Sequence, residues 1–396
     1  MAPTDRTDSE MIYLDNNATT AIDPRVAAAI DDCHRRGPGN PSSQHRLGRE
    51  ARCRLDEAIE SIGDSLGTEL GLPGGPRLVI TSGGTEANNL AILGIGEPDG
   101  PLVISEIEHP SVFAAAEQAA AQGRDVRRIA VNRSGIIDLQ QLEDVVRRGP
   151  RPAVASLMSA NNETGVLQPI EAAGEICRDA GVPLHVDASQ SFGRVPVDLA
   201  AWSAAAVTIS PHKFHGPLGV GGLWLAAGVS PRPWLFGGGQ QLGLRPGTEP
   251  LPLVVGMAVA LRYAVQEQPA GYRQQRELRD RFETELTRRH GPWVVQGGDA
   301  PRLPGTSSLS MIGTDRQSLL MALDFAGIAC SSGSACSSGS SPPSHVLIAM
   351  GVPPEQLHST LRFGLSKFST AEEIETAIES ISRCYLKLRG VSAVEN

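Results

Sequence analysis

The feature that most constrains the fold of this chain is an alternation of short apolar runs with helical patterns between about residues 24 and 225. Such alternation is typical of βα units stacked on a mostly parallel sheet. Four of the runs, each followed at once by a polar turn, are Arg77–Thr81, Leu102–Ser105, Ala153–Ser159 and Pro183–Val186. Ligands of open α/β sheets bind beyond the carboxyl ends of the strands, so we expect these turns to meet at one crevice.

Individual residues mark helix ends between these runs. Asp23 followed by Pro24 is typical of a helix start, and Gly123 and Gly181 are typical of positions just past a helix end. Over residues 47–66, apolar side chains recur on one face, which predicts a helix packed against the core.

The pattern changes after Trp224. A glycine-rich stretch, Gly237–Thr248, is expected to connect two domains, and the long charged helical pattern that follows it ends near His290. The remainder, about 291–396, predicts a smaller α+β domain. Its expected elements are the strand Ser307–Met311, the helix Asp315–Phe325, a Ser/Gly-rich loop over 331–344, the strand Ser359–Leu365 and the helix Ala371–Leu388, begun by a capping box of Thr370 and Glu373.

Composition excludes several classes of protein. With 396 residues, 40% of them apolar, the chain has a globular composition and the length of one large or two ordinary domains. Its 35 Lys and Arg against 44 Asp and Glu give a net charge of −9, the wrong sign for binding nucleic acid. The longest apolar run, Leu251–Leu261, is too short to span a membrane, and the first ten residues lack the apolar segment of a signal peptide. Six cysteines without a CxxC pair fit a reducing compartment, so we expect a soluble cytoplasmic protein without a nucleic-acid, membrane or metal partner.

The turn over Ser82–Glu86 lies between a predicted strand and a predicted helix. Its glycines allow the backbone to approach a ligand closely, and the first N–H groups of the helix can bind an anion. The turn is therefore a candidate phosphate site, although an ordinary tight turn explains the same residues equally well.

Asp187 directly follows the predicted strand Pro183–Val186, and Lys213 lies in the turn that follows a fifth predicted strand, Ala205–Ile209. A buried carboxylate needs a cationic or hydrogen-bonding partner, and a protonated pyridine nitrogen is one such partner. Lys213 lies in a tight turn between His212 and His215, where desolvation and nearby cations favour a neutral amine able to form a Schiff base. A single lysine is more simply a surface residue. Together, however, the two residues match the two groups by which proteins hold pyridoxal phosphate.

Nine segments, in order along residues 11–390, resemble those of the cysteine desulfurases of the class V aminotransferase family. They are YLDNNATT (Tyr13–Thr20), TSGGTEANN, SEIEHPSV, NNETGV (Asn161–Val166), HVDASQS (His185–Ser191), SPHKFHGPLGVGGL, RPGTE (Arg245–Glu249), SSGSACSS and STLRFGLS. The resemblance implies a fold-type-I α/β enzyme that uses pyridoxal 5′-phosphate, with a mostly parallel seven-stranded sheet. The implied division is a large cofactor-binding domain over 21–262 and a small α+β domain made of 1–20 and 263–396.

The resemblance also implies roles for single residues. Lys213 is similar to the lysine that binds the cofactor's aldehyde, Asp187 to the partner of the pyridine nitrogen, and His109 to the histidine that stacks on the ring and transfers protons. The further implied contacts are Gly84, Thr85, Ser210 and His212 at the phosphate, and Asn162 and Gln190 near the phenolic oxygen.

Other matches concern the substrate and the oligomer. Arg362 resembles the arginine that binds the substrate carboxylate, near Asn162, and Thr248 resembles a phosphate contact donated across a homodimer interface. Cys336, in the loop at about 330–345, resembles the nucleophile of desulfurases with a long mobile loop. An incidental cysteine in a surface linker is the alternative, and the nucleophile is favoured. The implied reaction converts L-cysteine to L-alanine and leaves a persulfide on Cys336 for a sulfur-acceptor protein of iron–sulfur cluster or thiolation pathways. A selenocysteine lyase, another class V aminotransferase and a non-catalytic scaffold of a sulfur pathway are alternatives.

Some residues depart from the family pattern. Pro211 and Pro246 replace smaller residues and should stiffen the cofactor loops. Gln241 and Leu242 stand where an interface ion pair is usual, which puts such a pair in doubt. Cys330 could be a resolving thiol, but a buried apolar role is favoured.

Overall fold

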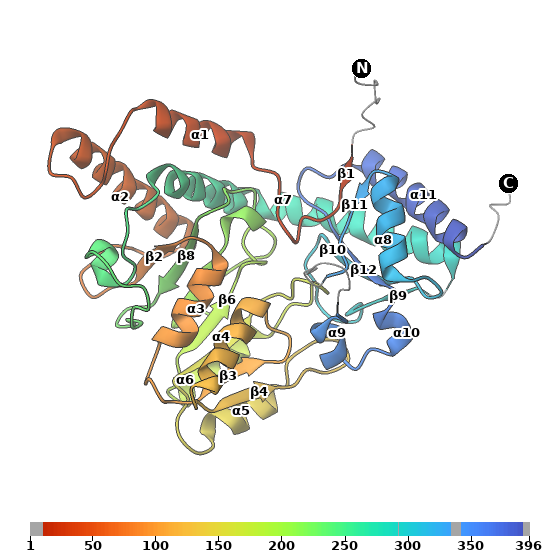
Figure 1. The fold of residues 1–396 in the computed structure, drawn as a ribbon, viewed down its shortest axis with the longest axis horizontal. Helices are drawn as coiled ribbons and strands as arrows, with labels where there is room; N and C mark the ends of the chain where they lie inside the picture. Colours follow the sequence, from red (N-terminus) through yellow and green to blue (C-terminus); the bar gives the residue numbers. More distant parts are fainter. Residues whose placement is uncertain (1–10, 292, 334–341, 391–396) are drawn as a thin grey trace.

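A seven-stranded sheet forms the centre of the computed structural model, which describes residues 11–291, 293–333 and 342–390 (Figure 1). In spatial order its strands are β2 (Arg77–Thr81), β8 (Gly221–Leu225), β7 (Ala206–Ile209), β6 (Leu184–Asp187), β5 (Val154–Met158), β3 (Leu102–Ser105) and β4 (Val126–Ile129). Strand β8 is antiparallel to both its neighbours, and every other adjacent pair in this sheet is parallel. The four predicted strands and the mostly parallel sheet are thus confirmed.

Helices cover both faces of this sheet (Figure 1). The six that precede β6 are α1 (Pro24–Arg35), α2 (Arg46–Leu66), α3 (Gly84–Gly94), α4 (Pro110–Ala121), α5 (Leu139–Arg147) and α6 (Ile170–Asp179). Successive strand residues point to opposite faces. Ile80 and Val103 accordingly pack with α1, α2, α5 and α6, whereas Val79 and Leu102 pack with α3 and α4. Both faces of the strands are therefore buried, which explains their near-continuous apolar sequences.

The predicted helix ends are confirmed by their local geometry. The Asp23 side chain accepts a hydrogen bond from the backbone N–H of Arg25, and Pro24 takes the first position of α1. Gly123 and Gly181 follow the ends of α4 and α6 with φ of +94° and +64°, a conformation that favours glycine.

A smaller group of elements follows the long helix α7 (Leu251–His290). Its strands are β9 (Val294–Val295), β10 (Thr306–Ser310) and β12 (Thr360–Gly364) in one antiparallel sheet, and β1 (Ile12–Tyr13) paired with β11 (Ile328–Ala329). Its helices are α8 (Arg316–Phe325), α9 (His345–Ala349), α10 (Pro354–Leu357) and α11 (Ala371–Leu388). The predicted strands and helices of this region are confirmed to within one residue at each end, and the Thr370–Glu373 capping box is present.

Helix α7 spans both hydrophobic cores. Its residues up to Ala264 pack in the core of the large sheet, and from Leu278 onward they pack in a second core that contains Phe363. Phe282 and Phe363 are fully buried with ring centroids 5.1 Å apart, and burying each ring contributes about 1.5–3 kcal/mol. The division at residue 262 would fall inside this helix, and it stays a prediction.

The glycine-rich stretch 237–248, expected to connect two domains, instead lies at the edge of the large sheet. The side-chain amide of Gln241 accepts a hydrogen bond from the backbone N–H of Ile80 (2.5 Å) and donates one to its carbonyl (3.0 Å), on edge strand β2. Gln241 and Leu242 have φ of +49° and +61°, which turns the chain back toward the sheet. The crossing between the cores is made by α7. Composition alone could not reveal this, because the contact joins residues far apart in the sequence.

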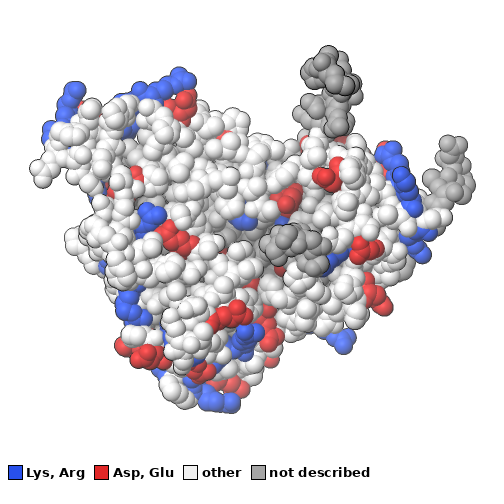
Figure 2. Space-filling view, viewed as in Figure 1, with Lys and Arg blue, Asp and Glu red and all other residues white. Residues whose placement is uncertain are grey.

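The outer surface carries charges of both signs. On the face in Figure 2, acidic and basic side chains are interspersed, mainly around its outline. Several form exposed pairs one helical turn apart, such as Arg36–Asp32 and Arg52–Asp56, and pairs of this kind stabilise a helix only weakly. Over the described residues, no helix combines the length and the apolar character needed to cross a lipid bilayer.

Candidate active site

The polar turns that follow the strands of the large sheet meet at one cavity of about 210 Å³. Among the residues predicted for the site, those that line the cavity are Gly84, Thr85, His109, Asn162, Asp187, Gln190, Ser210, His212 and Lys213. The expected crevice at the carboxyl ends of the strands is confirmed.

One end of the cavity is shaped for an anion. Helix α3 begins at Gly84, so its first backbone N–H groups have no partner within the helix. A Cβ on Gly84 would lie 3.2 Å from the Ser189 Oγ and 3.5 Å from the Ser210 Oγ, so the missing side chain leaves room bordered by two hydroxyl groups. Ser189 was not predicted for the site. The sequence feature that could have identified Ser189 is its position two residues after Asp187, in the same turn.

Asp187 lies deeper in the cavity and is only 5% exposed. Its carboxylate accepts hydrogen bonds from the Asn88 Nδ2 (2.8 Å) and the Ser189 backbone N–H (3.0 Å). Within the described part of the chain it forms no ion pair, so a cationic ligand group would complete its surroundings. Asn88 also donates to the Ser111 Oγ at 2.9 Å, and neither residue was predicted. Asn88 lies one helical turn after Gly84, on the same side of α3, which is the only sequence signal it offers.

His109 is the N-cap of α4 and lines the same cavity. Its Nδ1 accepts a hydrogen bond from the Ser111 backbone N–H (3.2 Å), which places the ring proton of the neutral imidazole on Nε2. Burial is the largest effect on the pKa of His109 and lowers it. The charge of Asp187 raises this pKa, and the charge of Lys213 lowers it. The ring is thus set to accept or return a proton without carrying a permanent charge.

Lys213 ends a short 3₁₀ turn, Pro211–Lys213, that follows β7. Pro211 takes the first position of this turn, where its fixed φ is compatible with the backbone. The Lys213 Nζ donates hydrogen bonds to the carbonyl oxygens of Asn17 (2.8 Å) and Ala18 (2.7 Å). Burial, followed by the charges of Arg194 and Arg362, lowers the pKa of Lys213 to about 7. A substantial fraction of its amine is therefore neutral at neutral pH.

This pKa gives a testable pH dependence. Only the neutral amine reacts with acetic anhydride, so acetylation of Lys213 in the full-length, cofactor-free protein should become half-maximal near pH 7 and level off above it. An ordinary lysine would reach half-maximal reaction at a pH of about 10.4. Mass spectrometry of the Lys213 peptide after brief labelling at each pH measures the profile. A midpoint close to that of an ordinary lysine would contradict the assignment.

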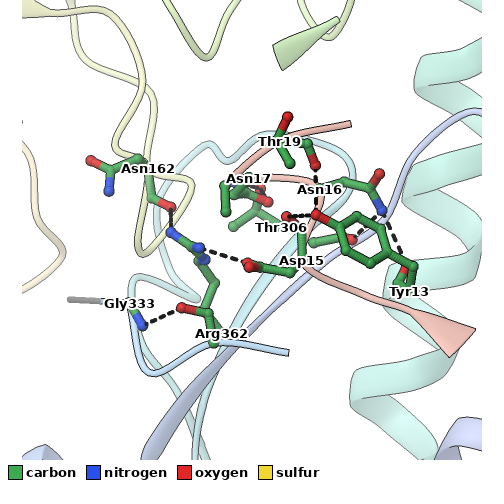
Figure 3. A network of polar contacts seen from close by, with 12 residues as sticks. Tyr13, Asp15, Asn16, Asn17, Thr19, Asn162, Thr306, Gly333 and Arg362 are labelled. Atoms are coloured by element: carbon green, nitrogen blue, oxygen red, sulfur yellow. Dashed lines mark hydrogen bonds and ion pairs between the residues drawn. The ribbon is translucent and has the colours of Figure 1, made fainter. Parts of the chain in front are cut away.

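Arg362 approaches the cavity from β12 of the smaller sheet (Figure 3). Its Nη2 pairs with the Asp15 carboxylate at 2.7 Å, and its Nη1 donates to the carbonyl oxygen of Asn162 at 3.0 Å. The Arg362 Nε is buried and has no hydrogen-bond partner among the described residues. An unpaired buried donor beside a residue that lines the cavity is suited to a ligand carboxylate.

Two predicted residues that the structure describes, Arg362 and Thr248, are not among those that line the cavity. Thr248 is exposed and lies outside it, in a segment anchored by an ion pair between the Arg245 Nε and the Glu86 Oε1 at 2.8 Å. Cys336 lies outside the described residues. Of the residues that flank it, Ser331 exchanges two backbone hydrogen bonds with Arg362.

Comparisons with known proteins agree with this geometry. The family model described as aminotransferase class-V matches residues 12–376. The chain belongs to this family. It is 37% identical to a cysteine desulfurase of Trichormus azollae over 98% of this chain and 96% of that protein.

Solved structures of the same family superpose on nearly the whole chain. The NifS-like protein of Rickettsia africae matches with a TM-score of 0.86 and 33% identity, covering 95% of this chain and 99% of that one. The structure of SspA in complex with cysteine matches with a TM-score of 0.76 and 31% identity, covering 90% and 99%. These matches confirm the expected fold-type-I architecture and the resemblance to cysteine desulfurases.

Class-V aminotransferases of this group use pyridoxal 5′-phosphate, which is therefore the cofactor of this chain. The cavity fits it. The helix start at Gly84, bordered by Ser189 and Ser210, offers donors for a phosphate. At the other end, Asp187 offers a carboxylate without a cationic partner for a ring nitrogen, and Lys213 offers an amine for an aldehyde.

Proposed function

We propose that this protein is a pyridoxal-phosphate-dependent cysteine desulfurase that converts L-cysteine into L-alanine and delivers the sulfur to an acceptor protein. The observation that carries the proposal is the placement of the Lys213 amine and the Asp187 carboxylate in one cavity, at the ends of adjacent strands β7 and β6. The cysteine desulfurase relatives that span nearly the whole chain support the choice of reaction.

The bound cofactor would supply an electron-withdrawing ring, and the residues around it would control protons and charge. Asp187 would hold the proton of the ring nitrogen, and Asn88 fixes that carboxylate by the 2.8 Å hydrogen bond. Lys213 would hold the aldehyde, while Gly84, Thr85, Ser210 and His212 would bind the phosphate and Asn162 and Gln190 would lie near the phenolic oxygen. His109, neutral with its proton on Nε2, would move protons near the ring.

Arg362 would orient the substrate through its carboxylate. The guanidinium is nearly buried and held by Asp15 and by the carbonyl of Asn162, so its plane is fixed before substrate arrives. The unpartnered Nε leaves a donor for this purpose. Asn162, which lines the cavity, would complete the substrate site together with Arg362.

The sulfur would leave on Cys336. The Cys336 thiolate attacks the sulfur of the substrate, the carbon–sulfur bond breaks, and the carbon takes up a proton, so that cysteine and a thiol become alanine and a persulfide. The persulfide then passes to a sulfur-acceptor protein of an iron–sulfur cluster or thiolation pathway.

The experiment that tests the reaction is a product assay on the purified, coloured holoenzyme. With L-cysteine and a reductant, we expect alanine and sulfide in equal amounts. Formation of a keto acid with transfer of the amino group would instead indicate an aminotransferase, and turnover of selenocysteine alone would indicate a lyase for that amino acid. A colourless protein without bound cofactor and without products would indicate a scaffold.

We also propose a cytoplasmic homodimer in which Thr248 reaches the phosphate site of the partner subunit. Thr248 is exposed in the single chain, and nearby Phe236 and Leu242 are 87% and 81% exposed, an unusual state for large apolar side chains. The five described cysteines are free thiols, as expected in a reducing compartment. Light scattering after size exclusion would test the dimer, and cell fractionation would test the compartment; a monomer with full cofactor occupancy would contradict the role of Thr248.

A further inference from the structure

Arg194 lies behind the active-site cavity and is only 7% exposed. Its guanidinium donates hydrogen bonds to the Gln190 Oε1, to the carbonyl oxygen of Asn16 (2.7 Å) and to the carbonyl oxygen of Lys213 (3.1 Å). All three acceptors belong to the site. Gln190 and Lys213 line the cavity. Asn16 belongs to the turn labelled in Figure 3, and the next two carbonyl oxygens of this turn accept hydrogen bonds from the Lys213 amine.

The positive charge of Arg194 has no acidic counter-ion in the described part of the chain. Three arginines with buried side chains differ in this respect: Arg279 pairs with Asp280, Arg302 with Glu283, and Arg362 with Asp15. Burial and the charge of Arg362 lower the pKa of Arg194 to about 10, so the guanidinium still carries its charge at neutral pH. A buried charge without a partner is costly. Such a group is more often found where the charge serves a functional site.

We propose that Arg194 is a positioning residue that acts through Lys213 and Gln190: its charge adds to the effect of burial in keeping the Lys213 amine neutral, and its guanidinium fixes the orientation of the Gln190 amide. This inference rests on the proposed role of Lys213 in holding the cofactor. The two effects are argued separately, because a charge causes the first and a hydrogen-bond geometry causes the second.

The charge effect follows from the groups around Lys213. Arg194 and Arg362 oppose a positive charge on its amine, whereas Asp187 and Asp15 favour one. The charge of Arg362 is offset by Asp15 at 2.7 Å, while that of Arg194 is not offset. The remaining titratable neighbours, His212 and His109, have pKa values lowered by burial, that of His212 to about 4, so both are neutral near pH 7. Of the two cations that face Lys213, Arg194 is therefore the one whose charge no acidic side chain of the described residues offsets.

The hydrogen-bond effect follows from the chemistry of the two side chains. A guanidinium can only donate, so the Gln190 atom that it contacts must be the amide oxygen. The Gln190 Nε2 is then the group that faces the carbonyl oxygen of Asn17 at 3.0 Å, and its second hydrogen is left for the cavity. Arg194 thus ensures that Gln190 presents a donor, rather than an acceptor, toward the oxygen of a bound cofactor.

Two substitutions separate these effects. Arg194→Gln removes the charge, so acetylation of Lys213 in the cofactor-free full chain should shift its midpoint upward by about 1 pH unit or more. Arg194→Lys keeps the charge, so its midpoint should remain that of the wild type. The pH midpoint of the visible absorbance of the holoenzyme should likewise shift upward in R194Q and remain that of the wild type in R194K. An unchanged midpoint in R194Q, or an equal shift in both variants, would overturn the charge effect.

Arg194→Lys also tests the orientation of Gln190. A lysine cannot reproduce the planar, multiple donors of arginine. R194K should therefore show a shifted absorption maximum of the bound cofactor, in the same direction as the shift in Gln190→Ala. If Q190A shifts the absorption maximum and R194K leaves it in place, the proposal that Arg194 fixes the orientation of the Gln190 amide is wrong.

Controls exclude a merely structural explanation. Arg302 does not line the cavity, and its buried guanidinium pairs with Glu283 at 2.8 Å. Arg302→Gln should therefore leave both the Lys213 midpoint and the absorption maximum unchanged. If R194Q is not recovered folded, Arg194→Met provides a second neutral variant, and R194K alone can still overturn the charge effect by shifting the midpoint. None of these readouts uses sulfide release, so failure of the proposed desulfurase reaction would be seen separately in the product assay.

Discussion

Replacing Lys213 with alanine is expected to reduce turnover of L-cysteine by roughly 10⁴-fold or more, the scale on which loss of a covalent catalytic group acts. No other amine can take its place. The chain has three lysines, and Lys367 is engaged by Asp23 at 2.8 Å and Glu267 at 2.7 Å, while Lys387 is exposed on α11. Asp187 and the phosphate cradle remain in the variant, so weak non-covalent binding of the cofactor should persist.

The small number of lysines makes the corresponding labelling experiment decisive. Reduction of the wild-type holoenzyme with borohydride, followed by digestion and mass spectrometry, should place the cofactor-derived mass on the Lys213 peptide. The Lys213→Ala protein should carry no such label, and Lys387→Ala should match the wild type in label and turnover. A label found on Lys367 or Lys387 would refute the assignment of the cofactor-binding amine.

Replacing Cys336 with serine is expected to lower sulfide release by at least about 100-fold while the borohydride label on Lys213 remains. The expected loss has a structural basis in the described residues on either side of Cys336. The Ser344 Oγ donates to the buried Glu163 carboxylate at 2.5 Å, and a Cβ on Gly333 would lie 2.9 Å from the same carboxylate. Glu163 directly follows Asn162 of the cavity, so Ser344 is anchored beside the site and Gly333 lies close to the same carboxylate.

The matched control is Cys330→Ser. Burial is the largest of the effects that raise the pKa of Cys330, which keeps its thiol protonated and a poor nucleophile. C330S should therefore retain sulfide release within about two-fold of the wild type. Normal release from C336S, or its loss only in C330S, would assign the nucleophile to the wrong cysteine.

Local patterns in the sequence were sufficient for most of the fold and for the central pair of the site. The strands and helix caps were predictable because apolar runs and capping residues act over a few positions. Asp187 and Lys213 were predictable because each follows a buried strand, and the parallel order of β6 and β7 then brings their ends together.

The supporting residues were not predictable in this way. Asn88, Ser111 and Ser189 acquire their roles through contacts with other strand-end turns, and nothing in their local sequence distinguishes them from ordinary turn or helix residues. Gln241 was noticed only as a departure from a family pattern, yet it binds the backbone of Ile80, 161 positions away. Arg194 stands out only when burial and the absence of an acidic partner in the described residues are seen together.

The turn at Asp15–Thr20 has a consequence for the synthesis of the protein. Carbonyl oxygens of this turn accept hydrogen bonds from the Lys213 amine. The turn is itself held by two later residues: Arg362 pairs with the Asp15 carboxylate, and the carbonyl oxygen of Gly364 accepts a hydrogen bond from the Asn16 Nδ2 at 2.8 Å. The turn must therefore wait for Arg362, 347 positions after Asp15, before the lysine is enclosed. A nascent chain that has not reached Arg362 would lack this closure, so the reactive centre would mature only after that residue is made.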